Sequence, residues 1–90
     1  AQKMQAQLQK DQKELESTIY EGVSSIVNVK MNGKYEVVSV DLNLTDDITI
    51  DDKDMLEDMI QVAINDAVKK ISSDKEKKMG RYGQGLAGLM

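Results

Sequence analysis

The first twenty residues have the apolar spacing of an amphipathic helix. Met4, Leu8, Leu15 and Ile19 are four, seven and four positions apart. At about 100° per residue they fall on a stripe only about 60° wide. The segment is rich in good helix formers and contains no Gly or Pro. The pattern predicts a helix over about residues 1–20, with a narrow contact face of the kind found in coiled coils.

Two β-rich segments flank the dipeptide Asn32-Gly33, the strongest short signal for a hairpin, because a type I′ turn needs two residues with positive φ. With this turn at the centre, Val29 would face Glu36 and Val23 would face Leu42. Side chains alternate between the two sides of a sheet, so the register sorts them into an apolar and a mostly polar face. The apolar face would carry Val23, Val27, Val29, Met31, Val38, Val40, Leu42 and Leu44. The sequence predicts an antiparallel hairpin over about residues 21–44.

The segment that follows is open to two interpretations, because residues 45–50, "TDDITI", could form a short third strand or a loop. A second helix should begin near Asp51, whose carboxylate can cap free N–H groups. It should end near Met79, since Gly80 is a favourable residue directly after a helix. Residues 80–90 contain four Gly in eleven positions and are predicted to be a flexible tail.

The second predicted helix is apolar over more of its circumference than one sheet can cover. Its apolar positions are Met55, Leu56, Met59, Ile60, Val62, Ala63, Ile64, Ala67, Val68 and Ile71. They sweep about 240°, whereas a helix lying on one sheet needs about 100°. A chain of 90 residues with no Phe and no Trp also has little material for a core of its own. We therefore expect a homodimer, with Met55, Met59 and Val62 at the interface.

These elements define a single α+β domain over residues 1–90. It consists of an N-terminal helix, an antiparallel β-hairpin or small sheet of two or three strands, and a long C-terminal helix. The absence of Cys removes disulfides and fits a reducing cytoplasm. No apolar run approaches the roughly 20 residues that a membrane-spanning helix needs, and the first ten residues lack the apolar centre of a signal peptide.

Charge is distributed unevenly along the chain. Residues 1–13 carry +2 (three Lys, one Asp), residues 14–68 carry −10 (three Lys, thirteen Asp or Glu) and residues 69–90 carry +4 (six cations, two acids), which sums to the net −4. An asymmetry of this kind bears on the choice of partners and not on the fold. An acidic chain with cations at both ends suggests a polyanionic partner, although exposed helix ends are often charged without one.

The composition gives no sign of an enzyme. With no His and no Cys, only carboxylates, Lys, Tyr, Ser and Thr remain as reactive groups, and none sits in a recognisable catalytic pattern. The acid-rich run from Asp41 lacks the Gly at position six and the Glu at position twelve that a calcium-binding loop requires. We expect no catalytic residues, metal, cofactor or small-molecule substrate.

Residues 51–71, "DDKDMLEDMIQVAINDAVKKI", resemble the YbaB/EbfC family of bacterial nucleoid-associated proteins, whose members carry a run close to "DDKEMLEDLVAAAFNDA" at this place. The Gln-, Lys- and Met-rich opening helix, the run "VNVKMNG" and the Gly-rich end "GQGLAGLM" follow in the same order. The likeness covers nearly all of the chain. The sequence lacks the Gly- and Met-rich start usual in the family, so we expect that some N-terminal sequence has been removed.

The resemblance implies a homodimer shaped like tweezers, whose helical arms bind double-stranded DNA in the bacterial cytoplasm, with a role in nucleoid organisation or gene regulation. The positions that match the family's DNA-binding arms are Lys3, Lys10, Lys13, Lys75, Lys77, Lys78 and Arg81. The chain has eleven Lys and one Arg, a ratio that favours contact with phosphates over readout of bases.

Two other interpretations of the same residues remain open. In the first, the protein is an interaction module whose first helix docks on a protein partner, and the lysines are merely solvated. In the second, the ligand is structured RNA recognised by its shape.

Overall fold

The computed structural model describes the backbone of residues 2–89 and the side chains of residues 2–80. The elements follow in the order α1 (Gln2–Ser17), β1 (Ile19–Ser24), β2 (Val27–Asn32), β3 (Val37–Leu42), a 3-10 turn η1 (Ile50–Asp52) and α2 (Lys53–Leu89). The three strands form one antiparallel sheet in the order β1-β2-β3. The predicted α+β architecture is confirmed.

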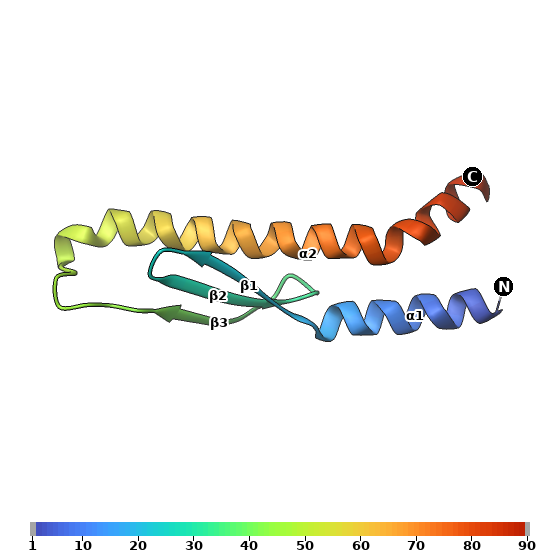
Figure 1. Ribbon diagram of the computed structural model, residues 1–90, viewed down its shortest axis with the longest axis horizontal. Coiled ribbons are helices and arrows are strands. Elements are labelled where there is room, and N and C mark those ends of the chain that lie inside the picture. Colours follow the sequence, from blue (N-terminus) through green and yellow to red (C-terminus); the bar gives the residue numbers. More distant parts are fainter. Residues whose placement is uncertain (1, 90) are drawn as a thin grey trace.

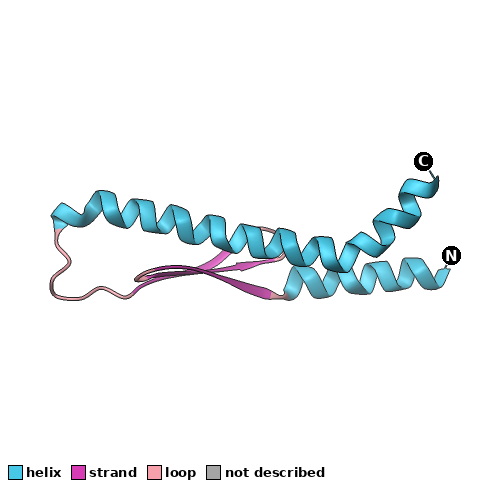
Figure 2. Ribbon diagram, turned by 45° about the horizontal axis from the view of Figure 1, so that its top comes forward, coloured by secondary structure: helices cyan, strands magenta, loops and turns pink. Residues whose placement is uncertain are grey.

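The molecule is a rod, with principal extents of 58 × 21 × 14 Å. Figure 1 shows α2 lying along the sheet and continuing past it, so that its C-terminal part runs beside α1. Figure 2 shows the same neighbourhood of the two helices from another side. We call α1 together with residues 69–89 of α2 the arm end, and residues 43–52 the loop end. Both termini lie at the arm end.

The first helix is shorter than predicted, because α1 ends at Ser17 and the following residues form β1. The hydroxyls of Ser17 and Thr18 both donate to the carbonyl of Glu14, which satisfies a free carbonyl of the last turn. Strand β1 then returns along β2 through a tight turn at Ser25 and Ile26, with φ of 52° at Ser25. The third strand therefore comes from residues 19–24, and the alternative of a strand at 45–50 is wrong.

The turn between β2 and β3 differs from the predicted two-residue type I′ turn. The loop has three residues, and the N–H of Tyr35 donates to the carbonyl of Asn32 at 3.1 Å. The positive φ, 65°, belongs to Tyr35 and not to Gly33. This is the three-residue hairpin loop that ends in a left-handed residue. The side-chain oxygen of Asn32 stabilises it by accepting the N–H of Lys34 at 2.9 Å and that of Glu36 at 3.2 Å.

The longer loop shifts the strand register by three residues at Met31, which pairs with Val37, and a bulge between Lys30 and Met31 raises the shift to four residues over the rest of β2. Val29 pairs with Val40 and Val27 with Leu42, instead of with Glu36 and Val38. Because side chains alternate with a period of two, the even shift keeps Val27 and Val29 opposite residues of the predicted apolar face, whereas at Met31 the partner is Val37, which was predicted on the polar face. The apolar face of β2 was therefore predicted correctly although its partners were not. Val23 was misplaced, since it lies on β1 opposite Asn28.

The core lies between this face and α2. Its buried apolar residues are Val27, Val29, Met31, Ala63, Ala67 and Ile71. Strand β1 passes so close to the helix that a Cβ on Gly22 would lie 1.9 Å from the carbonyl oxygen of Ala63. Small residues on both elements make this close approach possible.

The second helix also differs from the prediction at both ends. The 3-10 turn η1 precedes α2, and Thr49 is the N-cap of that turn: its hydroxyl accepts the N–H of Asp51 at 3.3 Å, and the Asp52 carboxylate accepts the N–H of Thr49 at 2.8 Å. The helix passes Gly80 and continues to Leu89, so the predicted end at Met79 is wrong and the backbone of residues 80–89, where a flexible tail was predicted, is helical. Gly80 alone costs a helix only about 1 kcal/mol, and residues 81–89 contain three further Gly but no Pro that would break it.

Candidate nucleic-acid interface

The arm end brings together two segments that are far apart in the sequence. The apolar stripe predicted for α1 faces inward over part of its length: Leu15 is buried and Leu8 is half-buried, whereas Met4 is exposed. Asp11 lies in the same stripe and is also buried, with the amide of Gln7 donating to it at 2.9 Å. Ile19, the fourth residue of the predicted stripe, lies outside the helix on β1.

The three lysines of α1 lie on the side of the helix opposite this stripe. Lys3, Lys10 and Lys13 are exposed, and helix geometry directs them away from the face that carries Leu15. The structure therefore brings α1 beside α2, but it does not turn all of the lysines predicted to bind DNA toward one another. Any ligand that meets both sets must extend around the arm end.

Charge at the arm end comes mainly from α2. Helix α1 holds three lysines and three acids (Asp11, Glu14 and Glu16), so residues 2–17 sum to zero. Residues 69–81 hold six cations and two acids, which sum to +4. The sequence analysis divided the chain after residue 13, in the middle of α1, and thereby overestimated the positive charge of that helix.

Two α2 lysines are partly neutralised by carboxylates one turn earlier. Lys78 lies 3.3 Å from Asp74, and Lys70 lies 3.4 Å from Asp66 while it also donates to the carbonyl of Glu21 at 2.6 Å. The pKa of the Asp66 carboxyl is lowered, chiefly because it accepts the N–H of Val23 and also because of Lys70. Lys78, one of the predicted contact residues, is thus the least available of them.

The remaining predicted lysines have no such partner. Within the described side chains, Lys3, Lys10, Lys13 and Lys77 make no ion pair. The amine of Lys75 lies 5.9 Å from the centre of the Tyr35 ring, in a cation–π arrangement that leaves its charge intact. Arg81, also predicted, lies outside the described side chains.

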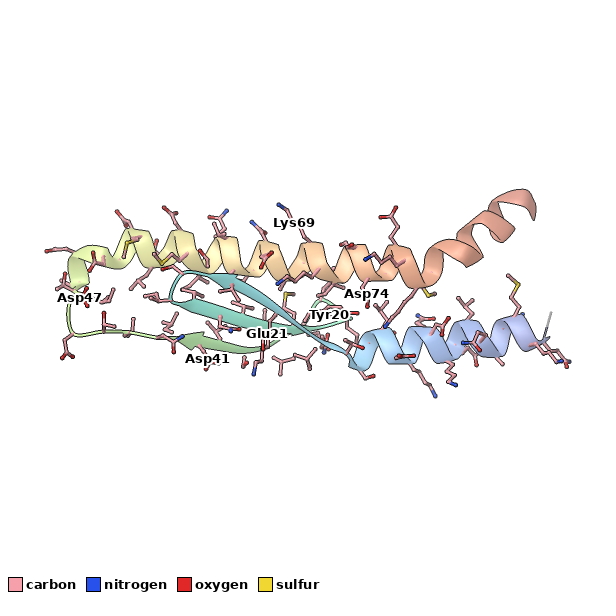
Figure 3. All side chains as sticks on the ribbon, viewed as in Figure 1. Tyr20, Glu21, Asp41, Asp47, Lys69 and Asp74 are labelled. Carbon is pink, nitrogen blue, oxygen red and sulfur yellow. The ribbon has the colours of Figure 1, made fainter. Side chains whose placement is uncertain are left out.

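A polar pair fastens β1 to α2 at the base of the arm end. The Tyr20 hydroxyl donates to Asp74, and Figure 3 shows the two side chains meeting between the sheet and the helix. Burial, together with this hydrogen bond to a carboxylate, raises the pKa of Tyr20 to about 12. The same hydrogen bond, helped by Lys78, lowers the pKa of Asp74. At neutral pH the Tyr20 hydroxyl is therefore protonated and can donate, and the Asp74 carboxylate is ionised and can accept.

The β2–β3 loop lies between the two helices. A Cβ on Gly33 would lie 1.9 Å from the carbonyl oxygen of Leu15, so the loop is pressed against the end of α1. On its other side the Tyr35 hydroxyl lies 3.0 Å from that of Ser72 on α2. Next to this loop, an open depression of about 430 Å³ is lined by Lys13, Glu16, Ser17, Asn32 and Lys34. The sequence analysis gave Lys34 no role, because it treated the turn only as a connection.

The loop end has the opposite charge. It carries Asp46, Asp47, Asp51 and Asp52 and no cation, and Figure 3 shows Asp47 at the extreme of the rod opposite the arm end. In the described part of the chain no three acidic side chains form a group that could hold a metal ion. No helix in that part is both long and apolar enough to cross a membrane.

Comparison with known proteins gives consistent matches. The model of the YbaB/EbfC DNA-binding family matches residues 1–86. A protein named nucleoid-associated protein from Chloroflexus aurantiacus is 44% identical, with 99% of this chain and 90% of that protein covered. One of the same name from Ligilactobacillus salivarius is 37% identical, with 98% and 86% covered. In fold, the chain resembles the crystal structure of an uncharacterized protein from Helicobacter pylori, with a TM-score of 0.66 at 23% identity over 84% of this chain and 89% of that one.

Proposed function

Because the chain belongs to the YbaB/EbfC DNA-binding family, we propose that it is a nucleoid-associated protein that acts as a homodimer and holds duplex DNA by its phosphates. Its place would be the nucleoid in the bacterial cytoplasm, with a role in DNA organisation or gene regulation. The family is one of DNA-binding proteins rather than of enzymes. The observation that carries the proposal is the +4 charge of residues 69–81, which run from the middle of the rod, at Lys69, toward the end opposite the acidic loop end.

The charge distribution favours contact with the DNA backbone. Each phosphate that a lysine neutralises releases condensed counterions, so affinity falls with salt in proportion to the number of contacts. Lysine is a point charge without the fork geometry by which arginine reads guanine, and the chain has eleven Lys to one Arg. The acidic loop end repels DNA and would orient the rod with its arm end toward the duplex. Low sequence specificity follows.

The proposed dimer would close a core that one chain leaves open. Val40 and Leu42 are 45% and 41% exposed, although their strand partners Val29 and Val27 are fully buried. The reason is that α2 lies against β1 and β2, and within the described part of the chain it makes no contact with β3. An edge strand with exposed apolar side chains is a surface for another chain.

The covering element would be α2 of a second copy. Met55 and Val62, predicted at the interface, are exposed on α2, whereas Met59, predicted with them, is half-buried and packs against its own core. A two-fold axis makes each contact occur twice, so Met55 and Val62 of one chain would meet β3 of the other, and the reverse. The exposed apolar residues of α2 in each chain would then cover the exposed apolar face of β3 in the other chain.

The experiment that tests the function is a titration of labelled duplex DNA with the full chain at salt concentrations from 50 to 300 mM. We expect the protein to bind at low salt. The logarithm of its binding constant should fall linearly with the logarithm of the salt concentration. Duplexes of different sequence should bind within a few-fold of one another. Absence of binding at low salt, or an affinity independent of salt, would reject the proposal.

A further inference from the structure

The β2–β3 loop, residues 33–36, is fixed to both helices of the arm end. Gly33 lies against the backbone of Leu15 at the end of α1, closer than any other residue type would allow. Tyr35 reaches the opposite helix, with its hydroxyl 3.0 Å from that of Ser72 and its ring 5.9 Å from the amine of Lys75. A hairpin tip is usually free in solvent, whereas this one bridges two elements.

The backbone of this loop is held in an unfavourable conformation. Tyr35 has a φ of 65°, in the left-handed region that costs a residue with a side chain about 1 kcal/mol. The contacts of its ring with α2 and the two hydrogen bonds to the Asn32 side chain offset this cost. Strain of this kind persists where the surroundings determine the conformation, and it is often found at functional sites.

Lys34 is the cation that the loop presents to solvent, next to Tyr35 and Glu36, which are also exposed. It is exposed and makes no ion pair within the described side chains. With Lys13 of α1 it lines the depression of about 430 Å³ next to the loop. Lys13 is one of the α1 lysines that face away from α2, so Lys34 extends the cationic surface on that side of the molecule.

The groups around this depression suit a phosphodiester. Two ammonium groups, those of Lys13 and Lys34, can each donate to phosphate oxygens. The one carboxylate there, Glu16, leaves a net charge of +1. Because the depression is open, it can meet a group that is part of a long polymer.

We propose that Lys34 and Lys13 form a phosphate-contacting site for the DNA backbone, so that the β2–β3 loop is a third DNA-contacting element beside the two helices. The inference rests on the proposed function. It assigns a role to a residue outside the helical arms and gives a reason for the rigid attachment of the loop. The lysine side chain keeps its freedom, while its backbone is held in place for a phosphate.

The test compares Lys34→Gln with Lys53→Gln, which makes the same charge change at the start of α2, in an exposed pair with Glu57. Affinity for a labelled duplex is measured over a range of salt, and circular dichroism confirms that both variants are folded. Lys34→Gln should weaken binding at least about fivefold at 0.1 M salt and reduce the salt slope by about 0.9 for each subunit whose loop contacts the duplex, whereas Lys53→Gln should change neither. Equal behaviour of the two variants overturns the inference and leaves the proposed function standing; failure of the unmodified protein to bind overturns both.

A second variant should change the affinity for duplex DNA in the opposite direction. Glu16→Gln removes the carboxylate that repels phosphate, so it should tighten duplex binding about twofold to fivefold. Unchanged or weaker binding contradicts the site. In amide NMR spectra, duplex DNA should shift the signals of Gly33 and Lys34 when it is added at micromolar concentration. Inorganic phosphate should shift the same signals only at millimolar concentration. Shifts with free phosphate and none with the duplex would identify a small-anion site and reject the DNA contact.

Discussion

Among single residues, Gly33 was correctly predicted to lie in the hairpin turn, but the reason why a glycine is needed there is different from the one predicted. The sequence analysis took Gly33 as half of a type I′ turn, but its φ is not positive and its lack of a side chain serves the approach of α1. That contact joins residues 18 positions apart and leaves no local trace. Tyr35, which carries the positive φ, could not have been predicted, because aromatic residues rarely adopt it.

The substitution Gly33→Ala should therefore destabilise the protein strongly. Its Cβ would lie 1.9 Å from a backbone oxygen of Leu15, and a backbone cannot yield as a flexible side chain can. We expect the free energy of unfolding to fall by about 3 kcal/mol, measured by urea denaturation. The matched control is Gly80→Ala, at a helical glycine whose Cβ would have nothing within 4 Å. It should stabilise by about 0.5–1 kcal/mol. Equal effects of the two variants would contradict the packing described.

The Tyr20–Asp74 pair gives a prediction for pH. The pKa of Tyr20 is raised from 10.0 to about 12, so its contribution to stability is complete below pH 10 and is lost as the pH rises toward 12. The pKa of Asp74 is lowered from 3.8, so its contribution is complete above that pH and is lost as the pH falls further. Tyr20→Phe should cost about 1 kcal/mol at pH 7 and progressively less above pH 10. A constant difference between pH 7 and 11.5 in urea denaturation would show that the hydrogen bond does not contribute.

At the scale of elements, the long helix and the apolar face of β2 followed from periodicity alone. Strand β1 did not, because Ile19 fits a helical spacing of four from Leu15 and the following residues were divided between a helix and a hairpin. What decides the matter is tertiary: Gly22 lies on Ala63 and Ala67 of α2, more than 40 positions later. The secondary-structure propensity of residues 19–24 cannot reveal a contact with residues more than 40 positions away in the sequence.

The open side of the sheet predicts which element controls dimerisation. Val40→Asp places a charge on the face that continues the core, so it should shift the protein toward the monomer in sedimentation experiments by at least tenfold in dissociation constant. The matched control is Ser39→Asp, on the other face of the same strand, opposite Lys30. It should leave the association unchanged.

The two-fold arrangement adds a second requirement. Val62→Asp on α2 should weaken association about as much as Val40→Asp, because the two areas are proposed to meet across the axis. A folded, monodisperse monomer of the unmodified chain at micromolar concentration would rule out the dimer altogether. If Val62→Asp had no effect while Val40→Asp did, the dimer would stand with β3 facing another surface.

At the scale of the whole molecule, the organising feature is charge separated along a rod. The sequence identified the cation-rich segment at residues 69–81, and composition was enough for that. It could not show that Glu14 and Glu16 neutralise α1, that Lys78 is paired with Asp74, or that Lys34 lies beside Lys13. Each of these three features depends on where a helix ends or on which segments the folded chain brings together.

The most direct test of the central claim compares two double variants in the duplex titration. Lys75→Gln with Lys77→Gln removes two charges from the arm end, and Lys30→Gln with Lys53→Gln removes two from the sheet and the start of α2. The arm variant should reduce the slope of log affinity against log salt by about 2 for each subunit that contacts the duplex, while the control should keep the slope of the unmodified protein. Equal slopes for the two variants would contradict the claim that the arm end holds the DNA backbone.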